Sequence, residues 1–485
     1  MEEGQLDPND FVLNDAINSL YSKAKSGADS SWKKKLIIGS IIGLILIIVL
    51  SVILVVVRYK NKGDNDKGKE IIAEIDCVYI INDATYSVNI LGEEYLKGNN
   101  DFDIYIGKEK TYYSKYYTFK GEGRYDISYK IYSNINMDYM FKGVTTLDSA
   151  LLISSKKAEI TSMKSTFENC INLNAVTISG FNTNNLLTVN RIFYNTKISK
   201  LALTDFSTSK IEDFSYMFAN TPKDTFDFSK FDTGSAKNMS HMFYKNTVVK
   251  NLDLSKLNTS NVVDMSYMFD SCESLISLNL SKFDTSKVTD MSSIFKNCLA
   301  LPGINLENFD TKNVENMAHM FESCDSLINI DLPSFNTEKV RNMNSMFKGC
   351  INLFNLDISK FNTKSVNDMA HIFDNCNLIK TLDVSHFDTS NVRNMSYMFY
   401  FCGILQNLDI SKFNTREVRD MSYMFTNCLS ITNLNVESFN TGKVENMAEM
   451  FEYCISLKKY LLKNSILLML KICQDYFKIQ LVLLI

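Results

Sequence analysis

The chain has 485 residues, of which 45% are hydrophobic and 22% charged, so it can bury a large core. The formal net charge is −4 and the isoelectric point is about 5.8, which shows none of the basic bias of a nucleic-acid-binding protein. We therefore expect no nucleic-acid partner. A chain of this length usually forms several domains, although a repeat array can form one long unit.

The N-terminal part predicts a membrane anchor. Residues 1–35 form a polar tail that ends in the triplet Lys33–Lys35, and residues 36–57 contain no charge. Such a stretch is long enough to cross a bilayer, and it lies too deep in the chain for an ordinary cleaved signal peptide. No cysteine lies in it or just after it, so a lipoprotein attachment site is absent. We expect a single-pass transmembrane helix in the cell membrane.

Charge decides little about the orientation of this helix. The numbers of basic residues near its two ends are equal, so the positive-inside rule gives no orientation. The triplet Lys33–Lys35 slightly favours a cytoplasmic N-terminus. Gly39 and Gly43 form a GxxxG pair, which leaves a weak homodimer through this helix open. Residues 58–70 are a charged linker.

Residues 71–137 are rich in tyrosine and predict a small β-rich domain. Segments such as Cys77–Ile81 and Ser128–Tyr132 have the composition of strands, with Gly and Asn turns between them. A solenoid needs a cover for the open apolar end of its first coil, so we interpret this region as a capping domain. A tyrosine-rich carbohydrate-binding module is the alternative.

Residues 138–457 contain one motif repeated with a period of 25–26 residues, which is the signature of a solenoid. The regular copies open on Phe231, Leu257, Phe283, Phe309, Phe335, Phe361, Phe387, Phe413 and Phe439. Cysteines follow the same step at Cys272, Cys298, Cys324, Cys350, Cys376, Cys402, Cys428 and Cys454. A second phenylalanine series runs from Phe141 to Phe451 and predicts about thirteen coils.

Within one copy the pattern predicts a turn, a short helix and a short strand. Asp264 is placed to cap a helix, and Met265, Met268, Phe269 and Cys272 then fall on one helical face. The alternation of Leu, Asn and Leu that follows is typical of a half-buried strand. We therefore predict an α/β solenoid with a parallel sheet along one face and helices along the other.

The repeat F-[DN]-T-x-x-V-x-[DN]-M-x-x-[MI]-F-x-x-C-x-x-L-x-x-L-[DN]-[LIV] resembles the 26-residue repeat of BspA-like leucine-rich-repeat surface proteins. The resemblance covers roughly residues 138–457. It implies a leucine-rich-repeat-like fold and a cell-surface protein, with the repeats extracellular, that mediates adhesion or recognises a protein or glycan ligand. A structural surface-coat or spacer protein without a specific ligand is the alternative function.

One polar position in each predicted strand lies between two apolar residues and must therefore point away from the core. We expect these residues to form a row on the exposed sheet face and to be the candidate ligand-binding face. The row consists of Asp253, Asn279, Asn305, Asp331, Asp357, Asp383, Asp409 and Asn435. The alternative is that these residues only solvate the sheet.

The sequence contains no pattern that indicates catalysis, a metal site or a cofactor. His241, His319 and His371 occupy one repeat position in separate coils, and no CxxC pair accompanies the spaced cysteines. Helices of neighbouring coils would lie about 8–10 Å apart, which is too far for a disulfide. We therefore predict buried free thiols and no enzyme activity.

The repeat pattern stops after Leu457. Residues 458–485 contain no F-[DN]-T motif and no Asx-Met pair. This tail is either a genuine C-terminal cap or the product of a shifted reading frame.

Overall fold

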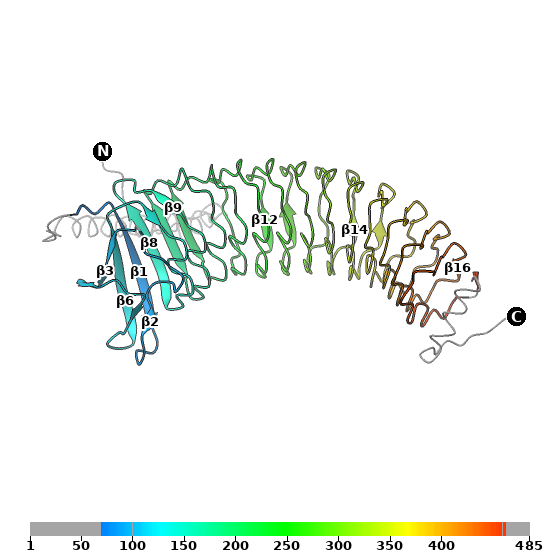
Figure 1. Ribbon diagram of the computed structural model, residues 1–485, viewed down its shortest axis with the longest axis horizontal. Coiled ribbons are helices and arrows are strands. Elements are labelled where there is room, and N and C mark those ends of the chain that lie inside the picture. Colours follow the sequence, from blue (N-terminus) through cyan, green and yellow to red (C-terminus); the bar gives the residue numbers. More distant parts are fainter. Residues whose placement is uncertain (1–68, 99, 458, 462–485) are drawn as a thin grey trace, which may run out of the picture.

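The computed structural model describes residues 69–98, 100–457 and 459–461. They form a curved rod of stacked coils, with a larger sheet at its N-terminal end (Figure 1). Across these described residues no helix is long and apolar enough to span a membrane. The transmembrane helix predicted for residues 36–57 lies outside the described residues, as do the polar tail and nearly all of the charged linker.

The N-terminal domain is built mainly from antiparallel strands, and only its last strand, β7, pairs parallel with the later strand β9 (Ile160–Ser162). β1 pairs with β6, and β6 pairs with β3. The strands of this region are β1 (Ala73–Ile81), β2 (Val88–Asn89), β3 (Phe102–Ile106), β4 (Glu109–Thr111), β5 (Tyr116–Tyr117), β6 (Gly123–Ile131) and β7 (Ile135–Asn136). Side chains of β1 alternate between buried and partly exposed, so one face of the strand enters the core.

The N-terminal domain and the first coils share one sheet. Its seven strands lie in the order β11-β10-β8-β1-β6-β3-β4. β1 pairs antiparallel with β8 (Leu147–Ser154), whereas β8 pairs parallel with β10 (Ala175–Ser179) and β10 with β11 (Lys200–Thr204). The strand direction therefore changes at β1–β8, and the antiparallel strands cover the edge that the first coil would otherwise leave open.

Further along the rod the strands become short and lie parallel, one copy apart. In β12 and β13, for example, Leu252 lies beside Leu278. The remaining strands are β9 (Ile160–Ser162), β12 (Asn251–Asp253), β13 (Ser277–Asn279), β14 (Asn329–Ile330), β15 (Asn355–Leu356), β16 (Asn433–Asn435) and β17 (Lys459–Leu461). Because β17 pairs with β16, the sheet continues into the first residues of the C-terminal tail.

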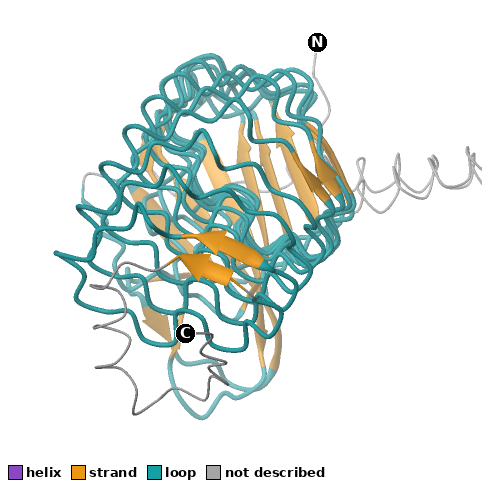
Figure 2. Cartoon of the chain, turned by 90° about the vertical axis from the view of Figure 1, so that its right-hand side faces the viewer, coloured by secondary structure: helices purple, strands orange, loops and turns teal. Residues whose placement is uncertain are grey.

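The predicted helices are wrong: the described part of the chain contains no α-helix, and Figure 2 shows only strands and loops there. The Asx-Met segments are instead chains of turns that bond to the next coil. The Tyr267 N–H donates to the Ser292 carbonyl at 2.9 Å, whereas the Asp270 N–H donates within its own turn to Tyr267 at 3.2 Å. Asp264 accepts at Oδ1 from the Ser266 N–H, so it caps a turn and not a helix.

Left-handed backbone conformations prevent the helix. Tyr267 has φ of 57° and Ser271 has φ of 61°, and equivalent residues of the other copies repeat these values. A right-handed helix requires negative φ at every residue, so two left-handed residues in one short segment exclude it. Because there are no helices in these segments, the predicted helix–helix separation of 8–10 Å does not apply. Backbone hydrogen bonds join the neighbouring coils instead.

The core is a set of columns that run along the rod. Thirteen phenylalanine rings stack in sequence from Phe141 to Phe451, and the Phe269 and Phe295 centroids lie 5.8 Å apart. Methionine, valine and cysteine columns pack beside them. The regular part of the described rod, where parallel bridges join successive Asx residues from Asn238 to Asn446, is a β-solenoid of about nine turns. The repeat architecture predicted from the period is confirmed, without its α component, whereas the predicted count of thirteen coils is not confirmed.

Candidate functional site

The predicted polar row lies on the surface. All eight of its residues are exposed, and most lie between buried neighbours, as Asp253 does between Leu252 and Leu254. Neighbouring coils bring members of the row together, since the Asn279 Nδ2 donates to Asp253 Oδ1 at 2.9 Å. The exposed position of these side chains, predicted from the strand alternation, is confirmed.

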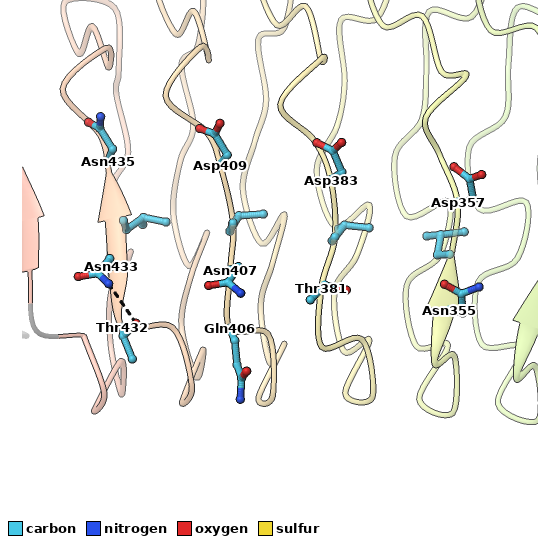
Figure 3. A pocket seen from close by; sticks show the side chains of 14 residues that line it. Asn355, Asp357, Thr381, Asp383, Gln406, Asn407, Asp409, Thr432, Asn433 and Asn435 are labelled. Atoms are coloured by element: carbon cyan, nitrogen blue, oxygen red, sulfur yellow. Dashed lines mark hydrogen bonds between the residues drawn. The ribbon is translucent and has the colours of Figure 1, made fainter.

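The C-terminal half of the row borders an open groove of about 980 Å³. Figure 3 shows that its polar side chains form two columns, with Asp357, Asp383, Asp409 and Asn435 above and Asn355, Thr381, Asn407 and Asn433 below. Each coil contributes one member to each column. The groove therefore presents amide, hydroxyl and carboxylate groups at a regular step along the sheet.

Hydrogen bonds orient the three carboxylates of the groove. Asp383 Oδ1 accepts from the Ser385 hydroxyl at 2.7 Å and from its backbone N–H at 3.0 Å. The same donors of Ser411 contact Asp409 Oδ1 at 2.6 and 3.0 Å. These hydrogen bonds lower the pKa of both carboxyls, so the groove is negatively charged at neutral pH.

A column of exposed apolar side chains follows the same sheet, three residues before the row. Ile276 is 48% exposed, Ile328 51% and Phe354 63%. The Phe354 N–H donates to the Ile328 carbonyl at 2.9 Å, so these two residues lie on adjacent coils. The repeat pattern does not predict this column, because the position before the strand is apolar in these three copies and polar in later ones.

The three histidines singled out by the sequence do not come together. His319 and His371 each contact a carboxylate of their own coil, at 2.6 Å to Glu322 and 2.8 Å to Asp374. His241 stacks between two tyrosines. No group of three metal-ligating side chains occurs within the described ranges.

The predicted burial of the cysteines is confirmed for seven of the eight ladder positions, and Cys454 is partly buried. Each thiol donates to a phenylalanine carbonyl of the preceding coil, as Cys350 does to Phe321 at 3.1 Å. Burial raises the pKa of Cys350 and Cys402 to about 12, which keeps both thiols protonated and unreactive. The ladder is thus part of the core.

These features define a repeat protein of the β-solenoid class with an open polar groove on its sheet. A family described as "Mycoplasma protein of unknown function, DUF285" matches residues 117–227, 213–327, 275–382, 301–403 and 377–469. The chain belongs to this family. The comparison with curated proteins finds no match.

Two solved structures are similar over much of the chain. The first is described as "Crystal structure of TLR13-ssRNA13 complex". It is 16% identical in sequence and covers 68% of this chain, with a TM-score of 0.19. "Functional domain of InlJ from Listeria monocytogenes includes a cysteine ladder" shares 11% identity over 59% of this chain and 69% of its own, with a TM-score of 0.15. The chain spans 65% of the length of the first of these structures.

Proposed function

We propose that this protein is a membrane-anchored, non-enzymatic surface protein of the BspA-like type, in which about thirteen coils present one recognition face. The observation that carries the proposal is the groove at Asp357, Asp383 and Asp409, where oriented polar groups recur at the step of the coils. The ligand is an extracellular protein or glycan. Extended faces of this kind are the usual binding surfaces of solenoids.

The apolar column, which reaches the groove at Phe354, favours recognition over a spacer role. A spacer needs only a solvated sheet, whereas Ile276, Ile328 and Phe354 expose large apolar side chains on the sheet face. Exposed apolar surface of this kind is typical of an interaction site. The polar groove and the apolar column together resemble a binding interface more than an inert surface.

Charge removal in the groove tests the proposal. Cells that display the full chain would be bound to a panel of extracellular-matrix proteins and glycans. The triple variant Asp357→Asn, Asp383→Asn and Asp409→Asn keeps side-chain shape, and Asn already occupies this row at Asn435. We expect adhesion to at least one panel member to fall about tenfold or more, as for loss of central interface contacts.

A matched control carries the same change of charge elsewhere. Asp284→Asn, Asp310→Asn and Asp388→Asn alter the F-[DN]-T turns, where other copies carry Asn. This control should adhere like the unmodified protein. Equal adhesion of both triple variants, with both folded, would exclude the groove as a charged recognition site and favour the spacer alternative.

The proposed topology has its own test. The uncharged stretch of residues 36–57 supports a membrane anchor, with the N-terminus cytoplasmic and the repeats outside. Protease treatment of intact cells should then remove the repeats while cytoplasmic proteins survive. Survival of the repeats while other exterior proteins are cleaved would reverse the orientation.

A further inference from the structure

A second hollow, separate from the groove, lies where the N-terminal domain meets the first coil. Its volume is about 640 Å³, within the range of small-molecule sites. One wall is the loop from Ile80 to Asn89, and the other is formed by residues 143–148 together with Asn172. Ligand sites occur preferentially at such junctions between structural units.

Both walls are held in place by hydrogen bonds. The Ile80 N–H donates to the Thr146 carbonyl at 2.8 Å and joins the two walls directly. On the second wall the Asn172 Nδ2 donates to the Thr145 carbonyl at 2.9 Å. On the first, the Thr85 hydroxyl and N–H both donate to Asp83 Oδ1, at 2.6 and 2.8 Å. The hollow is thus formed before any ligand binds.

The lining is polar and carries no positive charge. Its hydrogen-bonding side chains are Asn82, Asp83, Tyr86, Ser87, Asn89, Thr145, Thr146, Asp148 and Asn172, and no Lys or Arg belongs to it. Lys197 lies outside the lining but donates from Nζ to the Asn172 Oδ1 at 3.3 Å. The two carboxylates outnumber this single cation and disfavour an anionic ligand. The amides, hydroxyls and carboxylates together match a ligand that has many hydroxyl groups and no net negative charge.

One side chain, Tyr86, indicates how such a ligand would sit. The Thr146 Oγ1 has almost no accessible surface, so Thr146 shapes the wall and does not contact the ligand. Tyr86 is 61% exposed at the rim, although a large aromatic side chain gains by covering apolar surface. The C–H face of a sugar ring offers such a surface.

We propose that this junction hollow, formed by the Ile80–Asn89 loop, residues 143–148 and Asn172, binds one or two units of a neutral carbohydrate. Tyr86 contacts the apolar face of the ring, while the carboxylates of Asp83 and Asp148 accept hydrogen bonds from its hydroxyl groups. The site is independent of the recognition groove, which is lined by residues of the later coils.

The test uses the full chain in detergent micelles and a panel of free saccharides: galactose, glucose, mannose, N-acetylglucosamine, and sialic acid as the anionic member. Saturation-transfer NMR identifies a binder and calorimetry gives its affinity. We expect a neutral member to bind and Tyr86→Ala combined with Asp148→Asn to weaken it at least about tenfold, since stacking and a charged hydrogen bond are both lost.

Two controls make the result specific. Tyr112→Ala removes a tyrosine of the same domain that is 94% exposed and does not line the hollow, so it should bind normally. The groove variant Asp357→Asn, Asp383→Asn and Asp409→Asn should also bind normally, which separates this site from the proposed recognition face. The proposal is overturned if no neutral saccharide binds, if sialic acid binds as well as the best neutral sugar, or if the folded Tyr86→Ala/Asp148→Asn protein keeps full affinity.

Discussion

A threonine in each copy joins consecutive coils through its side chain. The Thr311 hydroxyl donates to the Asn336 carbonyl at 2.9 Å and accepts from the Asn336 N–H at 2.7 Å. Thr311 has no exposed surface, so water cannot replace either bond. The threonine of the F-[DN]-T motif is thus a structural residue, because one hydroxyl satisfies both polar groups of a backbone unit in the next coil.

Replacing Thr311 by Val should therefore lower the free energy of unfolding by about 1–3 kcal/mol, the cost of leaving buried polar groups without partners. Thr311→Ser keeps the hydroxyl and loses only a methyl group, at a cost of about 1 kcal/mol or less. Denaturant unfolding of the two variants measures the difference. Equal losses in both would show that packing, and not the hydroxyl, makes this residue important.

His241 should make stability depend on pH. Burial, together with the nearby Arg191, lowers its pKa from 6.5 to about 4, and its ring stacks at 4.1 Å on Tyr216 and 4.5 Å on Tyr267. Between about pH 6.5 and pH 4 the unfolded chain binds a proton at His241 that the folded chain does not. Stability attributable to this residue is therefore complete above pH 6.5 and falls as the pH decreases toward 4.

His241→Tyr tests that dependence, since tyrosine occupies the same repeat position at Tyr267. The variant should lose less stability than the unmodified protein when unfolding is measured at pH 7 and again at pH 4. A parallel decline of the two proteins over this range would show that His241 is not the group that titrates.

At the scale of the elements, the repeat pattern predicts the strand of the repeat correctly but predicts a helix where the structure has a chain of turns. Alternation placed Asp357 outside and Leu356 inside correctly, because a strand has a strict period of two. The apolar residues of the Asx-Met segment also fit one helical face, which is why the pattern predicts a helix there. The contrary signal was the residue before each cysteine, which is Asn297, Gly349 or Asn375 in three copies; these residue types tolerate positive φ.

The stacked phenylalanine column should make the turn segments of neighbouring coils unfold together. Phe321 is 1% exposed and stacks on Phe295 and Phe347, with 5.6 Å between centroids on each side. Phe321→Ala leaves a cavity and removes both contacts, so we expect a loss of about 3–5 kcal/mol in the free energy of unfolding. Phe354→Ala, at a site that is 63% exposed, should change stability by less than about 1 kcal/mol. Similar effects of both substitutions would contradict a core role for the column.

At the scale of the whole molecule, the features that follow the repeat period can be predicted from the sequence. The columns of Phe, Met, Cys and Leu follow from the repeat spacing, because each copy packs against copies of itself. The junction hollow could not be predicted in this way. Asp83 and Tyr86 lie in the N-terminal domain, which has no repeat, whereas Asp148 and Asn172 lie in the first coils. Only the pairing of β1 with β8 brings these segments together.

The same periodicity predicts that a whole copy can be removed. Deleting residues 309–334 joins Asn308 to Phe335 and takes out one period of 26 residues. Every remaining coil then faces an equivalent neighbour, so the backbone bonds between coils and the phenylalanine stack can re-form across the junction. The rod should shorten by about 4.8 Å, one strand spacing.

We therefore expect this in-phase deletion to remain monodisperse on gel filtration, with an unchanged β-type circular dichroism spectrum and a cooperative thermal transition. Deleting residues 309–321 instead removes half a period and sets a turn segment against a strand, which would leave the Phe321 column position empty and bury unpaired backbone groups. That variant should aggregate or melt without cooperativity. If the two deletions behave alike, the coils do not depend on their register with their neighbours, and the stacked columns are not what holds the rod together.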